Sequence, residues 1–376
     1  MKKVLQVVSV PHRGGAETMI MNVLRQTDHD EIQYDFISHT PNKSDYDEEI
    51  NSYGGKVIHI PSLGTIGIIR YIKKIMEINS KYGPYDIIHS HTNLQSAAVM
   101  LAAKLCNIKI RITHSHNTNW GMSSSVFSKL LIKLAQISIK IFSTEYFACG
   151  KEAAIAMYGE KDYKKNKVKI IQNGIDIDEF IQATKHKNIR NKLRKEMNIN
   201  EKSIVIGHIG RYHHQKNHEF IIELGKKLKK DKLDFRILLV GTGDKFQDIN
   251  KQISKEGLQS EVLQLGSRSD TPELYSVFDL FILPSRYEGL PLVMIEAQSS
   301  GKQCLVSDKI STESDMGLGL VEFLPIDRGA EPWLNAIKEK SFEGTTRSFY
   351  EIEQKISNRG FSSKTNAKIL HEIYMK

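Results

Sequence analysis

Residues 285–301 read SRYEGLPLVMIEAQSSG, and the apolar run LFILP at 280–284 comes directly before them. The apolar run predicts a buried strand, because it is short and bounded by turn residues. Residues 288–291 then turn the chain, and the apolar spacing of 292–300 predicts a helix, with Pro291 suited to its first turn. We therefore expect Glu288 on a loop at the carboxyl end of a strand and Glu296 on the helix that follows.

The turn between this strand and this helix carries groups that can bind a phosphorylated sugar. The backbone N–H groups of Gly289, Leu290 and Leu292 would be unpaired at the helix N-terminus, where phosphate binds readily. The carboxylates of Glu288 and Glu296 can accept hydrogen bonds from sugar hydroxyls. The stretch could therefore bind both ends of a nucleotide-sugar. The alternative is an exposed glutamate pair beside an ordinary helix.

The pattern E-G-L-P-L-x-x-x-E at 288–296 resembles the signature of the retaining GT-B glycosyltransferases of family 4, the glycosyl transferases group 1. The resemblance implies an α/β fold of two Rossmann-like domains, each with a doubly wound parallel sheet, that face each other across a cleft. It also implies that Glu288 contacts the transferred sugar and that Glu296 contacts the ribose.

Length and composition agree with a two-domain globular protein. The chain has 376 residues and a formal net charge of +9, without one long basic run. Such an excess could favour phosphate-bearing ligands or anionic membranes, and it gives little support to nucleic-acid binding. Cys106, Cys149 and Cys304 are scattered, which fits a reducing cytoplasm and predicts neither disulfides nor a zinc site. No signal peptide is visible, and no apolar stretch reaches the length of a membrane span.

The N-terminal segment predicts the start of a doubly wound domain. A strand at 4–10 is followed by a glycine-bearing loop at 11–17 and then by a helix. Gly14 and Gly15 would let the backbone approach a ligand closely. A similar G-G-x-E loop in the family implies that these two glycines lie beside the phosphates and sugar of the donor.

Two His-x-His pairs follow predicted strands, in D-I-I-H-S-H at 86–91 and in R-I-T-H-S-H-N at 111–117. Histidines at strand ends can hydrogen-bond a sugar or a phosphate, or they can cap the sheet. The resemblance assigns contact with the donor sugar to His116, with His114 as the second choice, since the doublet leaves the register open. We predict no metal site, because neither pair has cysteine or acidic residues at ligand spacing.

The segment 126–141 predicts an amphipathic helix. Its apolar stripe lies apart from its lysines, and the stripe consists of Val126, Leu130, Leu134, Ile137 and Ile141. One interpretation is a surface helix whose stripe faces the core. The other is a helix that lies on a membrane beside the acceptor site.

The second half of the chain carries a basic pair that flanks a loop at 212–216, after a predicted strand that starts at Ile204 and ends in glycine at Gly210. Arg211 and Lys216 lie five residues apart and could neutralise two linked phosphates, or they could be ordinary exposed residues. The sequence Gly210-Arg211 followed by Lys216-Asn217 resembles the family's diphosphate-binding loop. The resemblance further implies that Gly241, after the strand at 235–240, belongs to the donor site.

Residues 262–268 are predicted to form the next strand and turn, which end at Arg268. In the family the backbone of this turn flanks the nucleotide base. Arg268 could therefore lie over the base, and the alternative is a surface position.

We predict an acceptor-binding domain at 1–183, completed by a C-terminal helix at 364–376, and a donor-binding domain at 184–363. The lysine-rich segment 184–202 is predicted to be a linker. Residues 303–307 are predicted to form the last strand. The loop 307–313 departs from the G-G-x-x-E pattern of many family members, which puts the local loop in question.

The resulting hypothesis is a retaining glycosyltransferase that moves a hexose or N-acetylhexosamine from a nucleotide-diphosphate sugar, with a UDP-sugar expected. The acceptor would be a hydroxyl of a glycan or a lipid-linked glycan, in capsular or extracellular polysaccharide biosynthesis in the cytoplasm or at the inner face of the membrane. Glu288, His116, Arg211 and Lys216 are the predicted catalytic residues. No cofactor or metal is expected, because the basic pair can neutralise the diphosphate and the D-x-D at 45–47 lies in a polar loop. The alternatives are a sugar-nucleotide epimerase on the same fold and a non-catalytic carbohydrate-binding or nucleotide-sugar-binding subunit.

Overall fold

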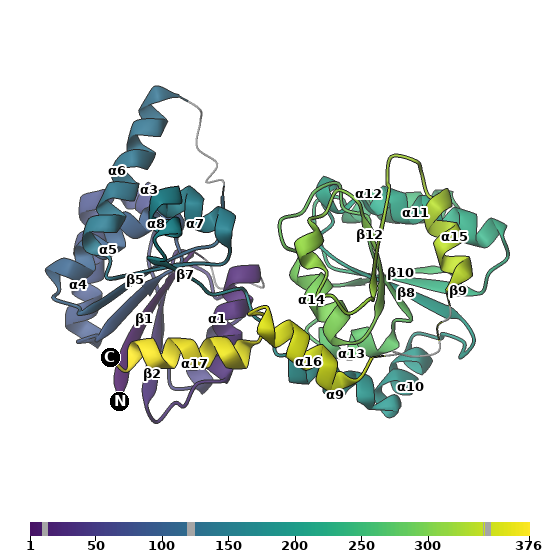
Figure 1. Cartoon of the computed structure of the whole chain (residues 1–376), viewed down its shortest axis with the longest axis horizontal. Helices are drawn as coiled ribbons and strands as arrows, with labels where there is room; N and C mark the ends of the chain where they lie inside the picture. The colour runs from purple at the N-terminus through teal and green to yellow at the C-terminus, as the bar shows by residue number, and fades with distance from the viewer. Residues whose placement is uncertain (10–13, 119–124, 341, 343–346) are drawn as a thin grey trace. The chain divides into compact units, whose positions relative to one another are not determined.

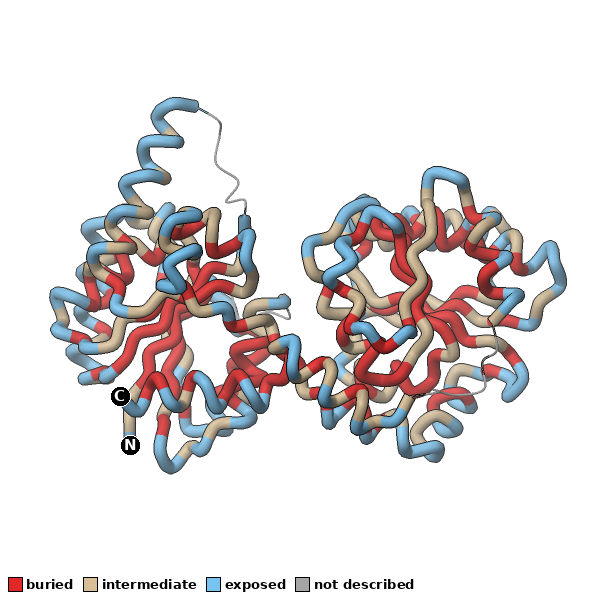
Figure 2. The backbone as a smooth tube through the Cα atoms, in the orientation of Figure 1, coloured by how far each residue is buried: buried red, intermediate tan, exposed pale blue. Residues whose placement is uncertain are grey.

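The computed structural model describes residues 1–9, 14–118, 125–340, 342 and 347–376. They form two compact units: unit 1 comprises residues 1–175 and 360–376, and unit 2 comprises residues 176–359. Each unit has a central parallel sheet with helices on both faces, and the strands in the middle of each sheet are buried (Figures 1 and 2). The predicted α/β architecture with two doubly wound sheets is therefore confirmed.

Unit 1 contains a seven-stranded sheet in the order β3-β2-β1-β4-β5-β6-β7, and the paired strands are parallel. The strand order reverses between β1 and β4, which is where ligands bind in doubly wound sheets. The strands are β1 (Lys2–Val8), β2 (Ile32–Ser38), β3 (Val57–His59), β4 (Ile87–Ser90), β5 (Ile110–Ser115), β6 (Glu145–Ala148) and β7 (Val168–Ile170).

Helices cover both faces of this sheet. Helices α1 and α17 supply one apolar core and helices α4 and α5 the other (Figure 1). The helical segments are α1 (Gly15–Arg25), α2 (Asp47–Ser52), α3 (Leu63–Ile66), α4 (Ile68–Tyr82), η1 (Asn93–Gln95), α5 (Ser96–Leu105), α6 (Val126–Phe142), α7 (Lys151–Tyr158), α8 (Glu160–Lys164) and α17 (Ser363–Tyr374).

Unit 2 contains a six-stranded sheet in the order β10-β9-β8-β11-β12-β13, again with parallel pairs. The strands are β8 (Ile204–Ile209), β9 (Phe235–Val240), β10 (Val262–Gly266), β11 (Leu280–Leu283), β12 (Gln303–Ser307) and β13 (Val321–Leu324). The prediction that β12 is the last strand is wrong, because β13 pairs along its outer edge.

The helical segments of unit 2 cover its sheet, and those at α11, α12 and α15 supply buried side chains to one large core that includes Trp333. They are α9 (Ile177–Lys185), α10 (Lys187–Glu196), η2 (His214–Lys216), α11 (His218–Lys230), α12 (Phe246–Lys255), α13 (Thr271–Val277), α14 (Leu292–Ser299), η3 (Thr312–Ser314), α15 (Glu331–Glu339) and α16 (Phe349–Asn358).

The segment predicted as a linker, 184–202, is instead ordered secondary structure of unit 2. Helix α10 occupies most of it, and Leu193 is buried. Arg190 forms an ion pair of 2.7 Å with Asp279, which ties α10 to the start of β11. The predicted domain boundary at 183/184 falls inside α9, whereas the chain divides between Ile175 and Asp176. The many lysines of this segment are the solvent face of packed helices.

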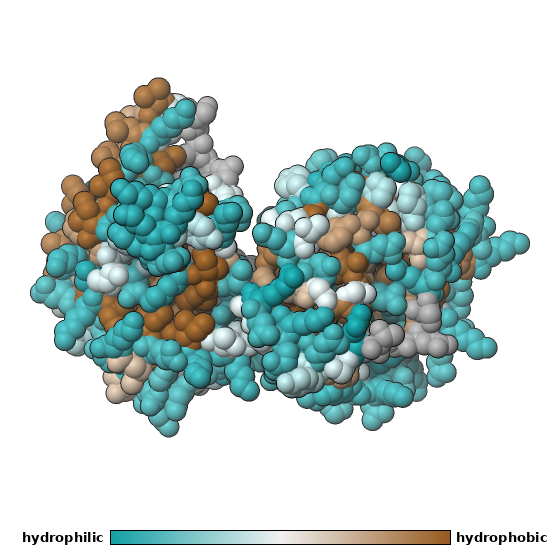
Figure 3. Space-filling view, in the orientation of Figure 1, coloured by the Kyte–Doolittle hydropathy of each residue, from teal (hydrophilic) through white to brown (hydrophobic). Residues whose placement is uncertain are grey.

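Helix α6 does not direct its apolar stripe at the core. Of its residues, Ile139 is buried, whereas Val126 and Leu130 are 85% and 55% exposed. Figure 3 shows hydrophobic side chains on the part of α6 that projects from unit 1. The core-facing interpretation of this stripe is therefore wrong. In the described part of the chain no helix is long and apolar enough to cross a bilayer.

The predicted return of the last helix to the first domain is confirmed. Helix α17 packs against α1, and its apolar side chains join the core on that face of the sheet. Gln6 donates a hydrogen bond to the hydroxyl of Tyr374, and this hydroxyl also lies 2.7 Å from His89 Nδ1. Unit 1 therefore needs the two ends of the chain together.

Ending the chain at Ser362 should unfold unit 1. The truncation removes Leu370, Ile373 and Tyr374 from the core. Each such side chain stabilises by about 1.5–3 kcal/mol, so the sum approaches the whole stability of a domain. Hydrogen exchange should show loss of protection in β1 and β4 but not in β8. Ending the chain at Tyr374 is the control, since Met375 is exposed. Full protection of β1 after the longer truncation would contradict this role for α17.

Candidate functional site

The residues predicted to bind a phosphorylated sugar in unit 2 lie where parallel strands end. Gly210 and Arg211 follow β8, Gly241 follows β9, and Glu288 follows β11. Strands β9, β8 and β11 are neighbours in the sheet, so their carboxyl ends reach the same edge. The sheet topology therefore gathers segments that are distant in sequence.

An ion pair between Lys216 and Glu288 joins two of these loops. Lys216 Nζ lies 2.7 Å from Glu288 Oε1, and the two side chains are only 16% and 9% exposed. Gln215 donates from Nε2 to Glu288 Oε2 at 3.0 Å and to the carbonyl of Tyr287 at 2.9 Å. Both carboxylate oxygens of Glu288 are therefore held in place by the loop after β8.

Two glycines allow these loops to pack closely. A Cβ atom on Gly210 would lie 3.1 Å from Lys216 Cδ. Gly241 has a φ of +135°, and a Cβ atom there would lie 2.2 Å from the carbonyl oxygen of Gly210. A side chain at Gly210 would therefore press on Lys216, and one at Gly241 would clash with the backbone of the loop after β8.

The loop that departs from the family pattern supports Glu288 from the other side. Glu288 forms a parallel β-bridge with Ile310, which is buried. The backbone N–H of Ile310 donates to the carbonyl of Ser307, the last residue of β12. The sequence S-D-K-I at 307–310 therefore builds a loop that fixes the backbone of Glu288.

The start of α14 differs slightly from the prediction. Pro291 is the N-cap residue, with φ −76° and ψ 112°, and the helix begins at Leu292. Among the described residues no side chain caps this end of α14. Gly289 is exposed and Leu290 is half-buried. The helix N-terminus keeps free backbone donors of the kind that bind an anion.

Glu296 lies on α14 and is half-buried. Burial raises the pKa of its carboxyl to about 7, while a hydrogen bond from Tyr275 and the charge of Lys216 oppose the rise. The Tyr275 hydroxyl lies 3.1 Å from Glu296 Oε2 and 2.9 Å from the carbonyl of Val293. Tyr275 had no signal in the sequence, because its spacing in α13 is that of a core residue.

The two arginines of the predicted site, Arg211 and Arg268, differ in their surroundings. Arg211 is exposed directly after β8. Arg268 makes a bidentate ion pair with Asp270, at 2.7 and 2.5 Å. This pair keeps the Arg268 guanidinium next to the N-cap of α13. Contact of Arg268 with a nucleotide base stays a prediction.

In unit 1 the predicted glycine loop leads into α1. Gly14 is the N-cap residue of α1, and Gly15 is its first residue. Residues 10–13 of the predicted strand and loop lie outside the described residues. Gly14 and Gly15 are therefore at the carboxyl edge of β1, as expected from the strand–loop–helix pattern.

Four histidines from the ends of β4 and β5 form one cluster in unit 1. The ring centroids of His89 and His91 are 4.2 Å apart, and so are those of His114 and His116. His114 is buried within β5, whereas His116 follows the strand and is half-buried. Burial lowers the pKa of His116 to about 4 and keeps the other three pKa values well below their usual range. All four rings are therefore neutral at neutral pH.

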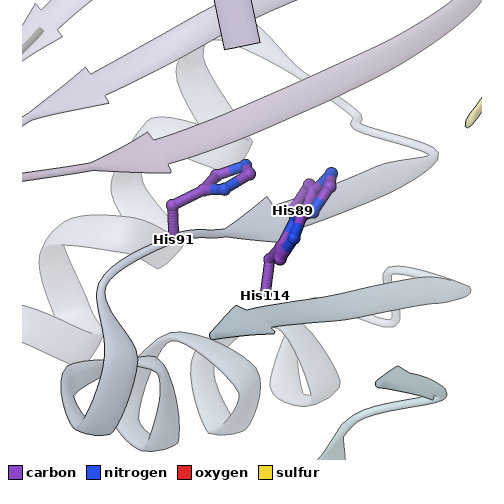
Figure 4. Close-up of side chains that lie close together, drawn as sticks. All are labelled: His89, His91 and His114. Atoms are coloured by element: carbon purple, nitrogen blue, oxygen red, sulfur yellow. The ribbon is translucent and has the colours of Figure 1, made fainter. Parts of the chain in front are cut away.

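Three of these histidines, His89, His91 and His114, offer nitrogen atoms within 4.8 Å of one another (Figure 4). The rings of His89 and His114 are stacked with an interplanar angle of 8°, so their lone pairs lie in nearly parallel planes. Both nitrogens of His91 lie at hydrogen-bond distance from other side chains. This geometry suits a stack of neutral rings better than a tetrahedral metal site.

Residues 13–179 match the family described as Glycosyltransferase Family 4, and residues 189–316 match Glycosyl transferases group 1. The chain is 33% identical over 373 residues to the putative glycosyltransferase EpsF of Bacillus subtilis, which covers 99% of this chain and 96% of the relative. The two family matches together cover most of the residues of both units.

Two further relatives are named for an activity or a role. The capsular polysaccharide biosynthesis glycosyltransferase CapH of Staphylococcus aureus is 26% identical, over 100% of this chain and 99% of the relative. The UDP-Gal:alpha-D-GlcNAc-diphosphoundecaprenol alpha-1,3-galactosyltransferase of Escherichia coli is 27% identical, over 67% and 66%.

The fold is similar to that of Anabaena Alr3699/HepE, whose crystal structure contains UDP and glucose. The TM-score is 0.75 with 19% identity, over 100% of both chains. This similarity concerns the fold, and it identifies the two parallel-sheet units as those of the GT-B class.

Tyr275→Phe should raise the pKa of Glu296 above its value of about 7. The substitution removes a donor that stabilises the carboxylate, and the loss of one such hydrogen bond corresponds to roughly one pKa unit. A carbon-13 NMR titration of the Glu296 carboxyl would measure the change. Tyr212→Phe is the control, because the Tyr212 ring stacks on His218 instead. An unchanged or lowered pKa in Tyr275→Phe would contradict the assignment.

Proposed function

This chain belongs to the glycosyltransferases of family 4, glycosyl transferases group 1, and we propose that it transfers a sugar with retention from a UDP-sugar to a hydroxyl of a lipid-linked glycan. The membership establishes a glycosyltransferase of the polysaccharide-biosynthesis type. The observation that carries the finer proposal is the Lys216–Glu288 pair beside the uncapped start of α14. It combines a cation, an anion and backbone donors at one sheet edge.

The proposed reaction breaks the bond between the anomeric carbon and the diphosphate oxygen. Negative charge grows on that oxygen, and Arg211, Lys216 and the N–H groups at Gly289 and Leu290 would stabilise it. The acceptor oxygen bonds to the anomeric carbon on the face that the diphosphate leaves. Its proton passes to the leaving diphosphate, so no separate protein base is required.

The two glutamates have different proposed partners. Glu288, which Gln215 and Lys216 hold by both oxygens, would accept hydrogen bonds from the transferred sugar as Lys216 turns toward the diphosphate. Glu296 would accept hydrogen bonds from the ribose hydroxyls, which favour its ionised form. His116, Gly14 and Gly15 of unit 1 would complete the sugar site, and Gly241 and Arg268 would flank the nucleotide.

No metal ion is needed in this scheme. Arg211 and Lys216 bring two positive charges, and the start of α14 adds a partial positive charge. These groups can balance a diphosphate, so we propose a metal-independent enzyme without a cofactor.

The choice of UDP and of a lipid-linked acceptor rests on the relatives. The Escherichia coli relative is named for a UDP-galactose donor and a diphosphoundecaprenol acceptor, and the Anabaena structure contains UDP. A role in capsular polysaccharide is supported by the name of the Staphylococcus aureus relative. An acceptor of this kind is anchored in the cytoplasmic membrane.

We also propose that unit 1 binds the surface of this membrane through α6. Phe127, Leu130 and Leu134 are 68%, 55% and 53% exposed, and Lys129 and Lys133 on the same helix are exposed. Apolar side chains beside lysines favour an anionic lipid surface. The helix would bring the acceptor-binding unit to its substrate.

Nucleotide release from a panel of UDP-, GDP- and ADP-sugars should single out one UDP-sugar, and the release should rise with a membrane lipid extract. Glu288→Gln should lower turnover by about 100-fold or more while the fold is kept, because the sugar loses a charged acceptor. Glu313→Gln is the matched control, since Glu313 is exposed on η3. Release that is independent of extract would favour an epimerase, and a GDP- or ADP-sugar preference would refute the UDP assignment. NMR of the product gives the anomeric configuration.

Replacing both Phe127 and Leu130 with serine should reduce binding to phosphatidylglycerol vesicles by about tenfold or more, since two apolar side chains leave the lipid. Tyr350→Ser is the control, because Tyr350 is 73% exposed in unit 2. Co-sedimentation with vesicles would measure the difference. Equal binding by the double variant and the wild type would refute the role of α6.

A further inference from the structure

A chain of hydrogen-bond contacts crosses the end of the sheet in unit 1 and passes through His116. His91 Nε2 lies 3.0 Å from Gln6 Oε1, and His91 Nδ1 lies 2.9 Å from His116 Nε2. His116 Nδ1 lies 3.2 Å from Asn173 Oδ1. Gln6 and His91 are 3% and 7% exposed, so water does not replace these contacts. Both ring nitrogens of His116 thus lie beside polar side chains of unit 1.

Gln6 sets the donor-to-acceptor direction of this chain of hydrogen-bond contacts. The amide nitrogen of Gln6 donates to the hydroxyl of Tyr374 at 3.4 Å, which turns the amide oxygen toward His91. An oxygen accepts only, so His91 must carry its proton on Nε2. His91 Nδ1 then has a lone pair, and it accepts from a proton on His116 Nε2. A neutral His116 is left with a lone pair on Nδ1.

We propose that His91, oriented by Gln6, is a positioning residue that fixes His116 in the tautomer with its proton on Nε2. Nδ1 of His116 then serves as an acceptor for a hydroxyl of the transferred sugar. This inference rests on the proposed place of His116 at the donor. It assigns Gln6 and His91, which no sequence motif connected to His116, a part in the reaction.

The contact with Asn173 shows why Nδ1 is suited to a hydroxyl. With the proton on Nε2, the lone pair of Nδ1 faces the oxygen of Asn173, and two acceptors do not form a hydrogen bond. If the Asn173 amide turns by half a rotation, its NH2 group can donate to this lone pair. A hydroxyl of the sugar can donate to the same lone pair. The position of His116 itself is set through its backbone, whose N–H donates to Asn93 Oδ1 at 3.3 Å and whose carbonyl accepts from Cys149 Sγ at 3.6 Å.

The test is a long-range proton–nitrogen NMR spectrum of the full chain labelled with nitrogen-15 histidine, recorded without donor. The signals of His116 are identified by their loss in His116→Gln. The wild type should show a protonated Nε2 and a bare Nδ1. In His91→Phe the lone pair that holds the proton is gone, and Asn173 becomes the acceptor, so the proton should move to Nδ1.

Two further variants separate this role from a general disturbance of the cluster. His114→Phe is the matched control, because the His114 ring stacks on the His116 ring with centroids 4.2 Å apart. A phenyl ring can keep this stacking, so the His116 proton should stay on Nε2. His91→Asn keeps an oxygen acceptor near the place of Nδ1 and should restore the wild-type pattern in part. A wild-type proton on Nδ1, or a proton that stays on Nε2 in His91→Phe, would overturn the proposal.

Activity is then measured with the nucleotide-sugar that the panel of UDP-, GDP- and ADP-sugars identifies as the donor. His91→Phe should lower kcat/KM by about tenfold, the rate equivalent of one hydrogen bond, and His91→Asn should recover part of it. A normal kcat/KM in His91→Phe would refute the positioning role. The NMR spectrum needs no nucleotide-sugar, so it tests the tautomer of His116 even if the proposed function is wrong. A failure of the tautomer proposal can therefore be distinguished from a failure of the proposed function.

Discussion

The ion pair between Lys216 and Glu288 is the interaction on which the site in unit 2 depends. It joins the loop after β8 to the loop after β11, and these parallel strands are neighbours in the sheet. Either charge alone would be costly at a position that is so little exposed, so each side chain keeps the other in place. Gly210 leaves the room that the Lys216 side chain needs. A ligand with a diphosphate and sugar hydroxyls offers a partner to both members of the pair.

Much of the fold could be predicted because its signals are local. Strands β8 and β11 are short apolar runs that end in turn residues, and the helix after Pro291 has a clear period. Strand β13 was not predicted from the sequence, because Val321–Leu324 is an edge strand whose residues are all half-buried. The false linker has a related cause. Helix α10 buries only Leu193 and Arg194, so its composition resembles that of a solvated connection.

The site was predictable as a set of chemical groups but not as a set of contacts. The period of a strand tells which face a residue occupies, and together with the register between β4 and β5 it places His89 and His114 on the same face. It does not tell which side chain of another element will meet them. Gln215, Tyr275 and Gln6 satisfy the polar atoms of the predicted residues, and each comes from a segment without a motif.

The two glutamates of one motif show how surroundings divide their roles. Glu288 has a cation beside it, so its charge is balanced before any ligand arrives. Among the described residues, Glu296 has the Tyr275 hydroxyl as its hydrogen-bonding partner, and burial raises its pKa to about 7. Near neutral pH its carboxyl therefore exists in both forms, and hydroxyl donors draw it toward the ionised one. In the proposed function the paired Glu288 would bind the sugar and Glu296 would ionise on contact with the ribose. The same nine residues could then supply both roles, because the two carboxyls differ in their contacts with Lys216 and Tyr275.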